Sequence, residues 1–201
     1  MDSTRNQIVE FCKRKGRGYI FDSNDLLTLG LPYPALRTEL VNLVRSNWII
    51  RICRGIYCYP LLSEGKSIFP NEYYILQWIA NKRGYKTRAT GDYLEYLLGL
   101  KPKKNATLTL LTDGKIHTVN FENGYSAIIK PSRKLPSFGD TKSELAILIL
   151  QYLHENQNTN IPNSTLLKLK SLFESIPINE IDMVSVQPHL KSFLTQNDKK
   201  G

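Results

Sequence analysis

Residues 26–60 read LLTLGLPYPALRTELVNLVRSNWIIRICRGIYCYP, and they carry the clearest structural pattern in the N-terminal part of the chain. Four of its apolar residues recur at the spacing of a single helical face: Leu36, Leu40, Leu43 and Val44. Pro34 suits the first turn of a helix, where an N–H has no partner, and Pro32 keeps the preceding chain extended. The stretch therefore predicts a helix that begins near Tyr33 and buries one apolar stripe.

A shorter helix is expected just before it. The run Asp22-Ser23-Asn24-Asp25 supplies side chains that cap a helix N-terminus, and Gly30 suits the left-handed residue that ends a helix. Two helices joined through Gly30-Leu31-Pro32 are typical of a helix-turn-helix. A further helix is expected upstream, from about Ser3 to Lys15.

Two runs rich in β-branched and aromatic residues follow, at residues 48–53 and 56–59. Arg54-Gly55 lies between them and predicts a tight hairpin with Arg54 at its tip. Helix, turn, helix and hairpin in this order predict a winged helix-turn-helix over residues 1–62.

Such a domain suits duplex DNA, because the major groove admits one α-helix while cationic side chains beside it neutralise phosphates. On the outer face of the second helix we expect base contacts from Tyr33, Arg37 and Thr38, with Asn42 beside them. Phosphate contacts are expected from Arg45, Arg51 and Arg54. Two other interpretations stay open: these are ordinary solvated polar residues, or the winged helix docks a protein.

The composition favours a polyanionic partner or an acidic protein. The chain has 27 Lys and Arg against 18 Asp and Glu, a formal charge of +9, and a pI near 9.4. It has no apolar run long enough to cross a bilayer, and its first residues lack the apolar core of a signal peptide. We therefore expect a cytoplasmic protein without membrane contact.

Residues 63–69 lack periodicity and carry small polar residues, which predicts a linker before a second domain over residues 70–201. In that domain Asp113-Gly114 joins two strand-like runs, 106–112 and 115–121, and predicts a hairpin. A third antiparallel strand is expected over residues 125–130. Helices are expected over residues 71–82, 90–98, from Thr141, 165–175 and 186–194. The predicted fold class is α+β: an N-terminal winged helix-turn-helix, then a mixed domain with a small antiparallel sheet and flanking helices.

Three segments together resemble a known family: Arg54–Pro60 (RGIYCYP), Ala89–Leu100 (ATGDYLEYLLGL) and Leu110–Gly114 (LLTDG). The region from about Ile20 to Pro131 resembles the AbiEi-like antitoxins of type IV toxin–antitoxin systems and the related DUF6088 proteins. The resemblance implies that the winged helix represses the chain's own promoter. It also implies that the second domain opposes an AbiEii-like nucleotidyltransferase toxin, without requiring a stable complex with it.

The residues argue against catalysis in this chain. A nucleotidyltransferase holds metal with two carboxylates one residue apart after a Gly-Ser, and that pattern does not occur here. The histidines His117, His154 and His189 are far apart and have no cysteine at ligand spacing. No phosphate-cradling glycine motif is present. We therefore expect no catalytic residues, no metal and no cofactor.

Two alternative functions stay open. One is a winged-helix transcription factor whose second domain senses a ligand or dimerises. The other is a Mg²⁺-dependent nuclease that uses Asp113, Glu122 and a lysine such as Lys130, although the turn itself accounts for Asp113. A secondary nucleic-acid patch, with dispersed solubilising charge as the alternative, would comprise Arg88, Lys101, Lys103 and Lys104.

Overall fold

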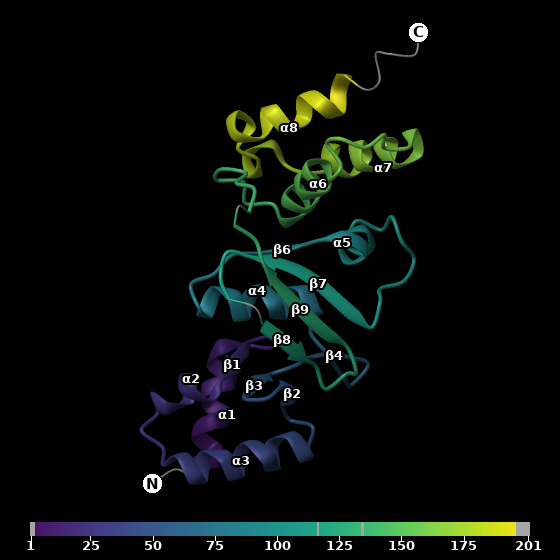
Figure 1. The fold of residues 1–201 in the computed structure, drawn as a ribbon. Coiled ribbons are helices and arrows are strands. Elements are labelled where there is room, and N and C mark those ends of the chain that lie inside the picture. The colour runs from purple at the N-terminus through teal and green to yellow at the C-terminus, as the bar shows by residue number, and fades with distance from the viewer. Residues whose placement is uncertain (1–2, 116, 134, 196–201) are drawn as a thin grey trace. The chain divides into compact units, whose positions relative to one another are not determined.

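The computed structural model describes residues 3–115, 117–133 and 135–195, and these form a mixed α+β fold (Figure 1). The described chain contains eight α-helices, one short 3-10 helix and small sheets. It divides into two compact units. The first extends to Gly84 and includes Val119–Ser126, and the second comprises Tyr85–Thr118 and the residues from Ala127 onward.

The first unit begins with three helices and a three-stranded sheet. Its elements are α1 (Thr4–Lys15), β1 (Ile20–Asp22), α2 (Ser23–Leu27), α3 (Tyr33–Arg45), β2 (Ile50–Cys53) and β3 (Ile56–Cys58). The sheet has the order β1-β3-β2, with both pairings antiparallel. The predicted start of α3 at Tyr33 and the predicted turn at Arg54-Gly55 are confirmed. The short strand β1 carries no pattern that the sequence analysis detected.

The caps of these helices follow from local chemistry. The Asp22 carboxylate accepts from the N–H groups of Asn24 and Asp25, and the Asp25 carboxylate accepts from the Asp22 N–H at 3.0 Å. Gly30 follows α2 with φ of 69°, the left-handed conformation that glycine adopts without strain. The capping box therefore begins α2, and the left-handed Gly30 lets the chain turn into α3.

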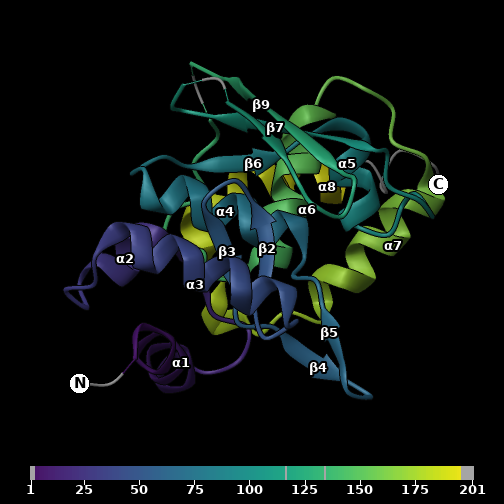
Figure 2. The ribbon, with the colours of Figure 1, turned by 90° about the horizontal axis from the view of Figure 1, so that it is seen from below.

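Residues 63–69, which the sequence predicts as a linker, contain part of a β-hairpin. Residues Leu61–Ser63 (β4) and Lys66–Ile68 (β5) pair as an antiparallel hairpin around Glu64 and Gly65, which both have positive φ. Figure 2 shows this hairpin extending away from α1. Every residue of the hairpin is exposed, so no buried face imposes the apolar alternation that marks a strand in sequence.

The domain boundary also differs from the predicted one. Helix α4 (Glu72–Lys82) belongs to the first unit, together with residues 119–126. The Asn123 amide donates to the Glu72 carboxylate at 2.8 Å, and the Lys82 ammonium pairs with Asp22 and Asp25. These polar contacts join α4 to one segment before it and one segment after it in the chain. No pattern in neighbouring residues indicates such distant contacts.

The remaining elements include a four-stranded sheet of order β6-β7-β9-β8. They are β6 (Thr87–Ala89), α5 (Gly91–Leu97), β7 (Thr107–Thr112), β8 (His117–Asn120), β9 (Ser126–Pro131), α6 (Glu144–Glu155), α7 (Asn163–Glu174), the 3-10 turn Ile178–Glu180 and α8 (Met183–Thr195). Helix α6 is buried on most sides, as its almost continuous apolar sequence predicts. None of the described helices combines the length and apolar character needed to cross a membrane.

The hairpin predicted at Asp113-Gly114 does not form. Strand β7 lies between β6 and β9, so β8 is not its neighbour. The Asp113 carboxylate instead accepts from the Lys86 N–H at 2.7 Å, next to the start of β6. Gly114 lacks the positive φ that an Asp-Gly hairpin turn requires.

Candidate nucleic-acid interface

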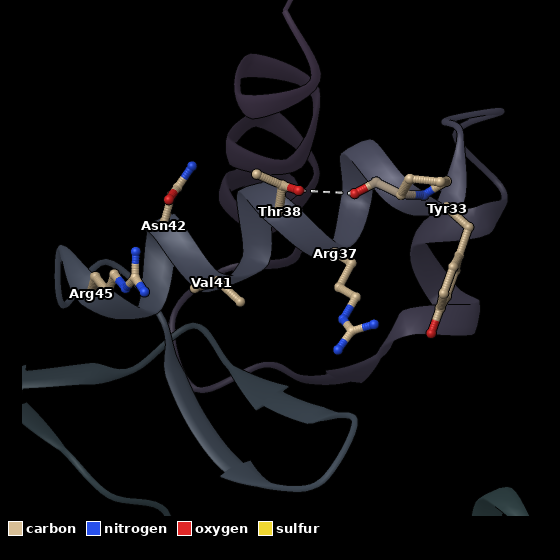
Figure 3. Close-up of a pocket in the computed structure, with 7 residues that line it drawn as sticks. Tyr33, Arg37, Thr38, Val41, Asn42 and Arg45 are labelled. Atoms are coloured by element: carbon tan, nitrogen blue, oxygen red, sulfur yellow. Dashed lines mark hydrogen bonds between the residues drawn. The ribbon is translucent and has the colours of Figure 1, made fainter.

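The outer face of α3 forms one open groove of about 510 Å³, shown in Figure 3. We call it the α3 groove, and it is lined by Tyr33, Pro34, Arg37, Thr38, Val41, Asn42 and Arg45. The structure thus brings together all five residues of this helix that the sequence predicts as DNA contacts.

The polar residues of α3 face solvent because the opposite face of the helix is buried in the hydrophobic core. Leu36 and Leu43 are fully buried and Leu40 is 2% exposed, whereas Tyr33 is 58% exposed. With 3.6 residues per turn, burying that stripe leaves the residues between its members in solvent. Packing alone therefore orients the polar face outward.

Two side chains on this face are held by short-range hydrogen bonds. The Thr38 hydroxyl donates to the Pro34 carbonyl at 3.1 Å, and the Asn42 amide donates to the Glu39 carboxylate at 3.3 Å. The Thr38 hydroxyl oxygen can still accept a hydrogen bond from a ligand. The Asn42 amide can still accept through its oxygen and donate through its second N–H. The cations Arg37 and Arg45 form no ion pair with a carboxylate of the described residues.

Tyr57 of β3, which no sequence pattern marks, lies within electrostatic range of Tyr33 and Arg37 of the groove. Burial raises the pKa of Tyr57, and the positive charges of Arg51 and Arg37 act in the opposite direction. Both arginines therefore lie within electrostatic range of one phenol. The outer face of α3 and the β2–β3 hairpin accordingly contribute positive charge to the same part of the first unit.

The two arginines of the β2–β3 hairpin differ in their surroundings. Arg54 is exposed at the two-residue turn, beside Gly55 with φ of 78°. Arg51 forms an ion pair with Glu122, with 3.4 Å between its Nε and the carboxylate Oε1. Its charge is therefore partly neutralised within the protein. Glu122 is remote in sequence, and no local pattern indicates this pairing.

The four cations of the predicted secondary patch lie in different surroundings. Lys101 pairs with Asp92 and with Glu95, whose carboxylate lies 2.7 Å from its Nζ, and both raise the pKa of Lys101. Lys103 is exposed and Lys104 is half-buried, both in the segment between α5 and β7. Arg88 lies on β6 and donates to the carbonyl of Thr87 at 3.0 Å. The four residues therefore do not form a uniform cationic surface, because the charge of Lys101 is paired with two carboxylates.

The carboxylates weighed for a nuclease each have a protein partner. Asp113 accepts from the Lys86 N–H and Glu122 pairs with Arg51, while Lys130 is exposed on β9. In the part of the chain that the structure describes, no three His, Cys, Asp or Glu side chains gather at metal-binding distance.

The comparisons with known proteins reach only the family level. The model of a family of unknown function, DUF6088, matches residues 7–181. The matched region begins within α1 and ends just before α8. A search among curated proteins found no match.

Proposed function

We propose that this chain, which belongs to the DUF6088 family of unknown function, is a DNA-binding antitoxin that represses its own operon. The observation that carries the DNA-binding part is the α3 groove, where Arg37 and Arg45 share one exposed helix face with Tyr33, Thr38 and Asn42. Arginine, asparagine and threonine are among the side chains that contact base edges and phosphates.

In this proposal the first unit is a winged helix-turn-helix. Helices α2 and α3 form the helix-turn-helix, α3 enters the major groove, and the β2–β3 hairpin is the wing that carries Arg54 to a phosphate. The order of the elements and the antiparallel β1-β3-β2 sheet support this assignment.

The antitoxin part rests on the segments RGIYCYP, ATGDYLEYLLGL and LLTDG, which resemble AbiEi-like antitoxins. The chain acts by occupying promoter DNA, and the chemistry belongs to its partner, an AbiEii-like nucleotidyltransferase toxin. Neutralisation proceeds without a requirement for a stable complex between the two proteins.

A mobility-shift titration of the full chain on DNA from upstream of its gene tests the DNA-binding part. With about three phosphate contacts per copy, a fourfold rise in salt should weaken binding roughly 40-fold, because the released counterions set the slope. The double variant Arg37→Ala/Arg54→Ala should lose most of the affinity while keeping its unfolding midpoint. Equal affinity of the variant and the unmodified chain would refute the α3 groove as the interface.

Co-expression with the nucleotidyltransferase-like protein of the neighbouring gene tests the antitoxin part. Restored growth supports the proposal, and the Arg37→Ala/Arg54→Ala variant shows whether rescue depends on DNA binding. Specific DNA binding without any rescue would leave a winged-helix regulator and remove the antitoxin role.

A further inference from the structure

The second unit contains a cavity of about 390 Å³ that the DNA-binding proposal does not use. We call it the second-unit pocket. Three cationic residues line it, Lys86, Arg88 and Arg133, together with the single carboxylate of Asp113. These residues come from one end of the antiparallel β6–β7 pair and from the segment after β9, so the tertiary fold assembles them.

Among the described residues, no carboxylate forms an ion pair with a cation of this pocket. The carboxylate of Asp113 accepts from the backbone N–H of Lys86. Arg88 donates through Nη1 to the Thr87 carbonyl, but its buried Nε has no hydrogen-bond partner among the described atoms. Leaving the buried N–H of a charged guanidinium without an acceptor costs free energy. An anionic ligand that accepts from Arg88 Nε would remove this cost.

Apolar residues form a further part of the pocket, which Ser137 and Thr141 also line. Pro136, Phe138 and Ile147 line it, and Phe138 is 2% exposed. A cationic end beside an apolar wall suits a ligand that has an anionic group and a flat apolar body. The volume lies in the range of small-molecule sites.

We propose that the second-unit pocket binds a small phosphorylated molecule of nucleotide size, with Arg88, Arg133 and Lys86 around the phosphoryl oxygens and Phe138 against the organic body. Guanidinium groups bind phosphate through paired, charge-assisted hydrogen bonds. The inference concerns only the second unit and does not depend on the α3 groove binding DNA.

Isothermal titration of the full chain at low salt tests it, with pyrophosphate, the four common nucleoside triphosphates and a short single-stranded oligonucleotide as separate titrants. Pyrophosphate and at least one nucleotide should bind. Arg133→Gln should weaken that binding at least about tenfold, because it removes a charged donor from an exposed position. Arg88→Gln should act in the same direction, and its unfolding midpoint shows whether the variant is folded.

Two further variants complete the design. Asp113→Asn keeps the oxygen that accepts from Lys86 and removes the negative charge, so it should strengthen binding by up to about fivefold. Lys66→Gln removes an exposed cation of β5, outside the pocket, and should leave binding unchanged. No heat with pyrophosphate or any nucleotide, binding that Arg133→Gln leaves intact, or binding of the oligonucleotide alone would overturn the proposal.

Discussion

Arg51 of β2 and Glu122 of the β8–β9 connection form an ion pair, with 3.4 Å between Nε and Oε1, although they are distant in sequence. The Glu122 N–H also donates to the Ile52 carbonyl at 2.9 Å. The strand that leads to Arg54 is thus held in place by a segment far along the chain. This contact separates the two arginines of the hairpin into one paired and one exposed cation.

Replacement of Arg54 should therefore affect DNA binding more than replacement of Arg51. In mobility-shift titrations against salt, Arg54→Ala should lower the slope of log affinity on log salt by about 1. Arg51→Ala should change the slope less, because Glu122 already neutralises that guanidinium. Glu122→Gln releases Arg51 and should strengthen binding. Equal slopes for both alanine variants would contradict the distinction.

Adjacent residues on the two faces of α3 should separate stability from binding. Leu40→Ala removes a side chain that is 2% exposed and should reduce the free energy of unfolding by about 2–5 kcal/mol. Val41→Ala, at 43% exposure, should change it by less than about 0.5 kcal/mol and alter DNA affinity instead. Urea unfolding and mobility shift on both variants check this, and a large stability loss at Val41 would place that side chain in the core.

The three thiols should resist modification while the protein is folded. All are buried and unpaired by disulfides, and burial raises the pKa of Cys12 and Cys58 from 9.0 to about 12 and that of Cys53 to about 11. At pH 8 the reactive thiolate is scarce, so an aromatic disulfide reagent should label the three cysteines only after denaturation. Rapid labelling of the folded chain would contradict the burial.

The same thiols predict how stability depends on alkaline pH. Because their folded pKa values are raised, the folded state retains protons that the unfolded state releases above pH 9. Their contribution is fully present below pH 9 and is lost as the pH rises toward about 12. Urea midpoints at pH 8 and pH 10 should show a decrease that is smaller in Cys12→Ala.

Gly139 should tolerate alanine poorly. A Cβ there would lie 2.1 Å from Asp182 Oδ2 and 2.6 Å from Ser185 Cβ, in a residue with φ of 59°. We expect Gly139→Ala to cost about 2–5 kcal/mol of unfolding free energy, from backbone strain together with the overlap. Gly124→Ala is the matched control, since Gly124 has φ of 89° and open space around it. It should cost about 1–2 kcal/mol, and equal losses would show that the overlap is relieved.

Local patterns predicted much of the first unit and of the α3 groove. The start of α3 at Tyr33, its buried stripe with Leu40 and the turn at Arg54-Gly55 all depend on neighbouring residues. Helix periodicity then also identifies the outward residues of α3, which is why five predicted DNA contacts gather in one groove.

The structure differs from the sequence-based predictions where the pairing of strands depends on residues that are distant in the chain. Residues 63–69 were expected to be a linker because an exposed hairpin has no buried face to pattern it. The Asp113-Gly114 pair is typical of a hairpin turn, but β6 and β9 pair with the two edges of β7. Strand β8 therefore cannot pair with β7.

Local sequence is enough to predict which residues form α3 and which of its faces points outward, because those properties depend on side chains within a few positions. The ion pair of Arg51 with Glu122, and the pocket that Arg88 and Arg133 line together, arise only when the chain folds. Ion pairs and pockets are contacts between residues that the chain separates and folding brings together, so their free energy has no local signature in sequence.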